Sequence, residues 1–306
     1  NVGKMRNRGF EAEVSYNKSI NKDFGFNVAF NMSAIKNKMT ELDGDVSYIG
    51  LPTSVIHSLN FDQEVSRSAI GQPIGSFYAY KEDGLFQSEA EIKSYTNNKG
   101  ELLQPNAKPG DIKFVDVNGD GVIDGNDRDY IGNPLPDVTA GLTLGVNFHN
   151  FDLSLFFQGM FGNDVYDLTR YVGDFYNQSQ YNKNSRVVNA WTPTNTNTDI
   201  PRVTMDDPNN NIRPSSYYVQ DASFVRLKNM KIGYSVPQSI LSKIKFNSLY
   251  IYAQATNLFT ITGYDGIDPE VGLQSYSSDY RNLDMGVDRG IYPLSRTFTF
   301  GVNVSF

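Results

Sequence analysis

A stretch of twelve residues, 116–127, has the residue types and spacing of a calcium-binding loop. Oxygen-bearing side chains recur along it, and Gly121 takes the sixth place, where an EF-hand loop turns sharply. Calcium prefers six to eight oxygen ligands, which this spacing could wrap around one ion. The expected ligands, counting the backbone carbonyl of the valine, are Asp116, Asn118, Asp120, Val122, Asp124 and Asp127.

The last position of this loop departs from the EF-hand pattern. Asp127 stands where an EF-hand normally has a bidentate Glu, and its shorter side chain is typical of dockerin-type loops. No amphipathic helix pair flanks the loop, so a helical calcium sensor is not predicted. The same residues also suit a turn rich in Asx and Gly that holds no metal. We expect Ca²⁺ or a similar cation here, in a structural rather than a catalytic role.

A second group of candidates lies in residues 166–218, which are rich in Tyr, Asn, Thr and Pro and include the only Trp of the chain. Aromatic faces beside amide groups can bind sugars and peptides. The alternatives are packing of the loop against itself and an aromatic girdle at a membrane interface. The candidate residues for ligand or partner contact are Tyr166, Tyr171, Trp191, Tyr217 and Tyr218.

The chain lacks the residue combinations of common catalytic sites. It has no Cys and two His, which excludes disulfides, thiolate chemistry and a multi-His metal centre. It has no Gly-x-Ser-x-Gly motif. The loop carboxylates Asp206, Asp207, Asp265, Asp268 and Glu270 could be drawn as acid pairs for sugar hydrolysis, but their Asn-, Pro- and Gly-rich surroundings favour solvated turns. We therefore expect no enzyme.

The charge of the chain bears on its partners. The formal net charge is -7, and the 27 basic residues are dispersed along the sequence. Nucleic-acid binding relies on clustered Lys and Arg that neutralise phosphates. No nucleic-acid partner is expected.

The elements that must position these residues are predicted by the alternation of apolar and polar side chains, the two-residue period of a β-strand. In residues 24–34 the even positions are apolar and the odd positions are small or polar. The pattern recurs in 10–20, 138–148, 151–157, 249–256 and 298–306. It is less regular in 224–236, where a bulge is expected near Asn229.

Strand length and connections indicate the class of fold. The predicted strands have about 9 to 12 residues, whereas soluble strands average about 5 or 6 and tilted membrane-spanning strands need about 9 to 11. Short turns at 21–23 and 149–150 contrast with long links at about 35–137, 161–222 and 260–296. This pattern predicts an all-β fold, a segment of an antiparallel transmembrane β-barrel with long extracellular loops. A large soluble β-sandwich is the alternative.

Two further features concern the membrane. No run of about 18 apolar residues is present, so no membrane-spanning helix is predicted. Residues 1–6 lack the apolar core of a signal peptide, and we expect the chain to be a fragment of a longer protein.

Several stretches, taken together, resemble the C-terminal part of a SusC/RagA-type TonB-dependent outer-membrane transporter. They occur in order over nearly the whole chain, and it is their combination that is specific. The stretches are 5–11, 71–78, 83–87, 108–114, 131–134, 151–159, 224–234, 256–259 and 296–301.

The resemblance implies a fold and a cellular location. Residues 1–306 would form roughly the last third of a barrel of about 22 strands in the cell outer membrane, with about nine or ten strands here. The calcium-type loop 116–127 would lie in an extracellular loop region. The plug and the segment that contacts the TonB complex would lie upstream, in an N-terminal region that is missing here.

The resemblance also implies a function. Such transporters import oligosaccharides or peptides across the outer membrane, powered through TonB and assisted by a SusD-type surface lipoprotein. Outer-membrane lipid would be the other partner. The last strand resembles the signal that the barrel assembly machinery recognises, although ordinary edge-strand packing fits its alternation too. The residues of this expected signal are Phe298, Phe300, Val302, Val304 and Phe306.

Two functions from other classes are the alternatives. The first is a secreted, calcium-stabilised β-domain that binds glycan, and the second is a glycoside hydrolase that uses the loop carboxylates. A barrel segment would need the missing strands for stability, because unpaired strand edges are not tolerated in lipid. A soluble domain would fold in plain buffer.

Overall fold

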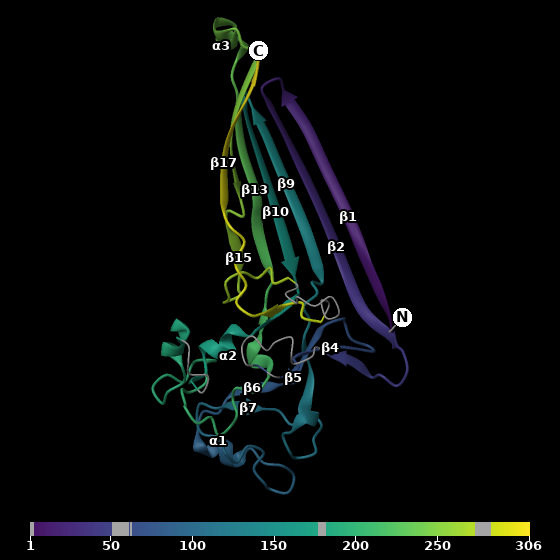
Figure 1. Ribbon diagram of the computed structural model, residues 1–306, viewed down its shortest axis with the longest axis vertical. Coiled ribbons are helices and arrows are strands. Elements are labelled where there is room, and N and C mark those ends of the chain that lie inside the picture. The colour runs from purple at the N-terminus through teal and green to yellow at the C-terminus, as the bar shows by residue number, and fades with distance from the viewer. Residues whose placement is uncertain (1–2, 51–60, 62, 177–181, 273–282) are drawn as a thin grey trace.

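The computed structural model describes residues 3–50, 61, 63–176, 182–272 and 283–306. One large antiparallel sheet rises from a folded region at its lower end (Figure 1). The strands of the large sheet are β1 (Gly3–Asn21), β2 (Phe24–Leu42), β9 (Val138–Phe148), β10 (Phe151–Phe161), β13 (Phe224–Ser235), β14 (Ser248–Thr256), β15 (Thr260–Thr262) and β17 (Thr297–Ser305).

We call the described residues within 43–137, 162–223 and 263–296 the loop region. It contains three small sheets, β3-β4-β5-β8, β6-β7 and β12-β11-β16. Their strands are β3 (Tyr48–Gly50), β4 (Ser66–Ala69), β5 (Ser76–Tyr80), β6 (Glu82–Leu85), β7 (Ile112–Phe114), β8 (Arg128–Gly132), β11 (Asp164–Asp167), β12 (Val219–Asp221) and β16 (Val287–Asp288). The helices of the chain are α1 (Glu89–Ser94), α2 (Thr169–Gly173) and α3 (Gln238–Ile244), with 3-10 turns at Gly125–Asp127, Ser185–Asn189 and Ser216–Tyr218.

The large sheet confirms the predicted all-β class. Its order is β1-β2-β9-β10-β13-β14-β17, with the short β15 paired to the start of β13. Every pairing in it is antiparallel. The expectation of about nine or ten strands was too high, because the described residues give seven along this path plus β15.

The first hairpin is longer than predicted. The strands β1 and β2 have 19 residues each, not about 9 to 12. The alternation of apolar residues stops at Ala34, and the remaining residues of β2 are mainly polar, yet they stay paired with the start of β1. Backbone hydrogen bonding therefore makes both strands longer than the apolar row from which the sequence pattern predicted them.

The two ends of the sheet differ in their connections. Lys22–Asp23 and His149–Asn150 make the two predicted tight turns, and His149 has a positive φ of 51°. At the same end α3 joins β13 to β14, a helix that the sequence pattern did not predict. The opposite end carries the loop region (Figure 1). Short links at one end and long ones at the other are confirmed.

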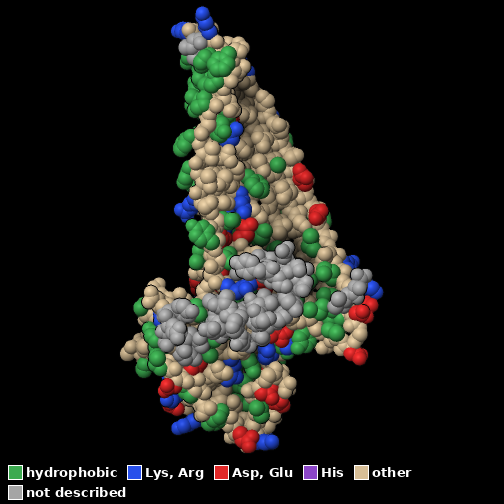
Figure 2. Space-filling view, in the orientation of Figure 1, with side chains coloured by type: hydrophobic (Ala, Val, Ile, Leu, Met, Phe, Trp, Pro, Cys, Tyr) green, Lys and Arg blue, Asp and Glu red, His purple; other side chains and the backbone are tan. Residues whose placement is uncertain are grey.

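The sheet has one apolar and one polar face. Cross-strand pairs such as Val28–Leu144, Leu155–Met230 and Ala253–Phe300 place the apolar rows of all seven strands on one side. No second sheet or helix layer covers this side in the described part of the chain. Much of the sheet turned to the viewer in Figure 2 is tan, the colour of backbone and uncharged polar side chains.

The bulge expected near Asn229 is present. In the β10–β13 pairing Phe156 faces Asn229 and the next residue, Phe157, faces Leu227. Lys228 is therefore the extra residue of the bulge. This one-residue shift keeps both Leu227 and Met230 opposite apolar partners although they are out of phase in the sequence.

The best-packed part of the molecule is the loop region rather than the sheet. Its main buried cluster draws on residues from Phe61 to Val287, including Phe77, Phe114 and Leu168. The long links are thus folded around an apolar core of their own. That core fixes the positions of the candidate site residues.

Candidate functional sites in the loop region and on the sheet

The calcium-type loop is organised by its own carboxylates. The carboxylate of Asp116 accepts hydrogen bonds from the backbone N–H groups of Gly119 (2.7 Å) and Gly121 (2.9 Å). Gly121 has a φ of +89°, a conformation that side-chain-bearing residues rarely adopt. The sharp turn predicted at Gly121 is therefore present.

The other end of the loop is held by Asp127, whose side chain is buried. One of its oxygens accepts from the backbone of Val117 (2.9 Å) and Asn118 (3.3 Å), and the other from the backbone of Asp124 (2.7 Å). Asp124 in turn accepts from Asn126 N–H at 2.7 Å, which completes a capping box. These bonds close the loop.

The oxygen atoms of the loop meet only part of what a cation needs. Each carboxylate oxygen has two lone pairs, so a bond to N–H leaves capacity for a metal. Among the described residues, however, no group of three or more Asp, Glu, His or Cys side chains converges closely enough to hold a metal ion. The loop has suitable chemistry but not, in this arrangement, a converged ligand shell. Calcium stays a prediction.

The five aromatic candidates lie together in the core of the loop region. Each is at most 7% exposed. Tyr166 stacks on Tyr218 with ring centroids 5.4 Å apart, and Tyr217 meets Tyr218 edge-on at the same distance. Burial raises the pKa of Tyr217 and Tyr218 well above 10, so both phenols stay neutral. Tyr171 and Trp191 belong to the same cluster.

Some of these aromatics donate hydrogen bonds to other residues of the loop region. Tyr217 donates to Asp174 at 2.6 Å, and Trp191 donates its indole N–H to Gln87 at 2.9 Å. The observed role of the group is to pack the loop region, one of the alternatives considered from the sequence. Contact with a ligand or partner by these residues stays a prediction.

A charged cavity of about 500 Å³ lies beside α2, near this core. Arg170 donates to the carbonyl of Tyr217 (2.7 Å) and to Asp265 (3.1 Å). Arg186 lies 3.4 Å from Asp174 and 3.3 Å from Asp199. The cavity offers both charge signs and hydrogen-bonding groups of both kinds. Sequence reasoning missed both arginines because no local motif marks them.

A neighbouring cavity of about 640 Å³ holds a carboxyl group with altered acidity. Burial, the largest cause, and the negative charge of Asp199 together raise the pKa of Glu82 to about 7, although the positive charge of Arg170 acts in the opposite direction. Glu82 belongs to β6, and its backbone N–H donates to the hydroxyl of Ser216 at 3.0 Å. This carboxyl group is therefore placed to titrate near neutral pH.

Of the five carboxylates considered as acid pairs, Asp206 and Asp265 are exposed, as expected for solvated turns, whereas Asp207 and Asp268 are buried, contrary to that expectation. Asp268 and Glu270 both pair with the buried Arg226, the latter at 2.9 Å. Asp207 accepts from the backbone of Asn211 (2.8 Å) and of Ile212 (3.1 Å). The chain uses these side chains to hold loops, because a buried carboxylate needs a partner.

The candidate assembly signal lies at one edge of the sheet. The strand β17 pairs with β14 alone, and its apolar side chains are exposed, for example Phe298 (62%) and Phe300 (81%). The other residues of the candidate assembly signal are Val302, Val304 and Phe306, which are also exposed. Their common face is confirmed, whereas their recognition by assembly machinery stays a prediction.

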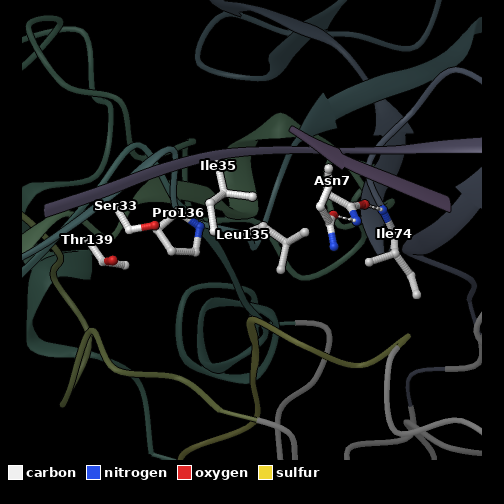
Figure 3. Close-up of a pocket in the computed structure, with 8 residues that line it drawn as sticks. Asn7, Ser33, Ile35, Ile74, Leu135, Pro136 and Thr139 are labelled. Carbon is white, nitrogen blue, oxygen red and sulfur yellow. Dashed lines mark hydrogen bonds between the residues drawn. The ribbon is translucent and has the colours of Figure 1, made fainter. Parts of the chain in front are cut away.

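The polar face has a small hollow where the sheet meets the loop region. Figure 3 shows Asn7 and Ile35 turned toward Ile74, Leu135 and Pro136 across a cavity of about 290 Å³. Asn37 of β2 accepts a hydrogen bond from the backbone of Ile74 at 2.9 Å. Odd-numbered residues of the first hairpin therefore face the loop region.

The comparisons with known proteins agree with this arrangement. The chain is 37% identical over its whole length to TonB-dependent receptor P3 of Formosa agariphila, covering 29% of that receptor. It is 27% identical over its whole length to TonB-dependent receptor SusC of Bacteroides thetaiotaomicron, covering 27% of it. No family model matches the chain.

Solved structures show the same fold. The structure of the RagAB peptide importer in the open-open state superposes with a TM-score of 0.74 at 24% identity, covering all of this chain and 29% of that one. The closed-closed state gives a TM-score of 0.72. None of the helices in the described residues is long and apolar enough to cross a membrane.

The uncovered sheet, with one apolar and one polar face, thus has the fold of part of a RagA-type barrel. The sequence of the chain matches TonB-dependent receptors, SusC among them, over its whole length, which confirms the resemblance stated above. It spans less than a third of the length of the relatives it matches.

Proposed function

We propose that this chain forms the C-terminal wall and part of the extracellular loops of an outer-membrane, TonB-dependent importer. The observation that carries the proposal is the apolar row that runs across all seven strands and is exposed. On β2 the row extends from Phe24 to Ala34, which is about 26 Å along the membrane normal at a tilt of about 40°. The apolar band of outer-membrane barrels is about 25 Å tall.

The importer would take oligosaccharides or peptides, powered through the TonB complex and assisted by a SusD-type surface lipoprotein. Support comes from the relatives, one of which is named SusC and another described as a peptide importer. In this proposal the loop region forms part of the extracellular mouth, where the charged cavity beside α2 offers groups for a polar cargo. The role is transport and not catalysis.

A pair of substitutions at adjacent positions tests the membrane placement. Val28→Arg puts a charge on the apolar face and is expected to destabilise the barrel by about 2 to 4 kcal/mol near the middle of the bilayer. Ala29→Arg, the matched control, puts the same charge on the polar face one residue further on. We would measure unfolding of the full-length transporter in vesicles and its TonB-dependent uptake of oligosaccharides and peptides.

Equal tolerance of both arginines would contradict the proposal, because a sheet in water does not distinguish its faces by lipid contact. A secreted, soluble domain would behave in that way. It would also need a cover for the apolar face, and none is present in the described residues.

We also propose that the 116–127 loop binds a structural cation. The support is the ligand chemistry and spacing, together with the loop closure by Asp116 and Asp127. Calcium is expected to raise the thermal stability of the full-length protein, and Asp116→Ala with Asp120→Ala is expected to abolish that effect. Asp43→Ala with Asp45→Ala serves as the control. Identical melting of the unaltered protein with calcium and with chelator would refute the cation.

A further inference from the structure

Four basic residues form an exposed square at the base of the first hairpin. Arg6 lies directly opposite Lys38, and Arg8 directly opposite Lys36, in the β1–β2 pairing. All four side chains are exposed, and none of them makes an ion pair within the described part of the chain. Like charges placed directly opposite each other across two strands are destabilising. We call these four residues the cation square.

The cation square lies on the same face as the apolar row. Side chains alternate along a strand, and the pairing is regular from Met5 to Ser19, so Arg6 and Arg8 share a face with Phe10 and Val14. The intervening odd-numbered residues, Asn7 among them, face the cavity of Figure 3 on the other side. The square therefore points outward and begins one step beyond the last apolar pair, Phe10–Ala34.

Edge protection does not account for the square. Lysine on an edge strand can prevent unwanted strand pairing, but two of the four cations belong to β2, which is not a free edge. Its other side pairs with β9 as far as Ala34, and Met39 exchanges backbone hydrogen bonds with Gly71 and Gln72. Glu41, the next carboxylate along β2, is already bound to Lys4 at 2.7 Å. The described chain thus leaves four positive charges in one place, although its net charge is -7.

We propose that the cation square binds the phosphate groups of an anionic lipid in the outer leaflet, next to the loop region. An acyl chain lying on the apolar row would bring its headgroup to this level, about 7 Å beyond Phe10 along the strand. Arginine binds phosphate through paired N–H donors, and lysine binds it as a point charge. The inference rests on the proposed placement of the apolar face against lipid.

The test uses the full-length transporter that contains this segment, reconstituted into vesicles of phosphatidylcholine alone or with bis-phosphorylated lipid A. Lipid A is expected to raise the unfolding temperature of the unaltered protein. Changing the cation square to glutamine is expected to remove most of this rise and to weaken lipid A binding by more than about tenfold, because each cation near an anionic surface contributes. Added salt should reduce the effect in the unaltered protein.

Two variants keep the test interpretable. Lys36→Gln with Lys38→Gln removes half of the square and is expected to lose about half of the lipid A effect. The control carries the same charge change at four exposed lysines of the loop region and is expected to keep the whole effect. Its positions are Lys81, Lys93, Lys99 and Lys108.

Three results would overturn the inference. One is equal stabilisation of the square variant and the unaltered protein by lipid A. Another is the same stabilisation by inorganic phosphate, which would identify a free anion and not a lipid. The third is a square variant that is less stable than the unaltered protein by the same amount with and without lipid A. That result would mean that carboxylates elsewhere in the protein neutralise the square. Failure of all variants to insert into vesicles would instead contradict the membrane placement.

Discussion

Buried charge in the loop region is almost always matched by a partner. Asp111, fully buried, lies 2.7 Å from Arg202 and accepts a hydrogen bond from Asn211 at 2.9 Å. Removing one member of such a pair leaves an uncompensated charge, which costs about 3 to 5 kcal/mol. Glu82 differs because its carboxyl is crowded by Asp199 and is largely removed from water. This side chain should make the loop region sensitive to pH.

The stability of the loop region is expected to fall as pH rises from about 4.5 to about 7. The folded-state pKa of Glu82, about 7, lies above its ordinary value of 4.5, so the protonated form is favoured in the fold. The stabilisation of the fold by protonated Glu82 is complete below about pH 4.5 and is lost as the pH rises through about 7. Resistance of the loop region to protease at pH 5 and pH 8 measures this. Glu82→Gln should flatten the difference, whereas Glu89→Gln, at an exposed site, should retain it. An unchanged pH profile in Glu82→Gln would assign the effect to other groups.

Within the sheet, two tyrosines of the polar face lie across glycines of neighbouring strands. Tyr250 of β14 reaches over Gly233 of β13 and donates to Asp152 of β10 at 3.0 Å. A Cβ on Gly233 would lie 2.0 Å from the Tyr250 hydroxyl oxygen. The ring of Tyr252 covers Gly301 of β17 in the same way. Glycine is needed here because a flat ring occupies the space above the backbone.

Gly233→Ala is therefore expected to displace Tyr250 and to destabilise the full-length barrel by about 1 to 3 kcal/mol, the usual cost of overpacking. Gly25→Ala on β2 is the control, because the nearest atom to its added Cβ is 3.4 Å away. Unfolding in denaturant, with tyrosine fluorescence as a second signal, would compare the two. Similar losses for both variants would show that Tyr250 moves aside freely.

At the scale of the molecule, the sheet is open at both sides. The edge of β1 away from β2 and the edge of β17 away from β14 have no partner strand in the described part of the chain. In lipid every backbone N–H and C=O must be paired, so such edges need further strands.

Residues 1–306 expressed alone are expected not to insert stably into membranes. Co-expression with the remaining strands of the transporter as a second chain should restore a closed, heat-modifiable barrel, because both edges would then be paired. Migration in SDS gels before and after heating measures this. Co-expression with an unrelated barrel fragment in place of the remaining strands controls for non-specific rescue. A monomeric, folded segment in plain buffer would contradict the membrane assignment.

The sequence alone determined the class of fold. Local side-chain patterns predicted the two-residue period of the long strands, the tight turns at one end, the bulge near Asn229 and the sharp turn at Gly121. The cation square was also readable in principle, from basic residues at alternate positions of 4–8 and 36–38. The alternation predicted which side chains share a face because neighbouring residues on a strand must point to opposite sides.

Only the tertiary structure decided how the long links are used. Residues from Phe61 to Val287 meet in one core, and no local pattern marks contacts between positions so far apart in the chain. The aromatic candidates became core, and Asp207 and Asp268 became caps and ion-pair partners, because burial forces polar groups to find partners. The charged cavity beside α2 likewise exists only because the tertiary fold brings Arg170 and Arg186 together from separate segments. Arg170 pairs there with Asp265, and Arg186 pairs with Asp174 and Asp199.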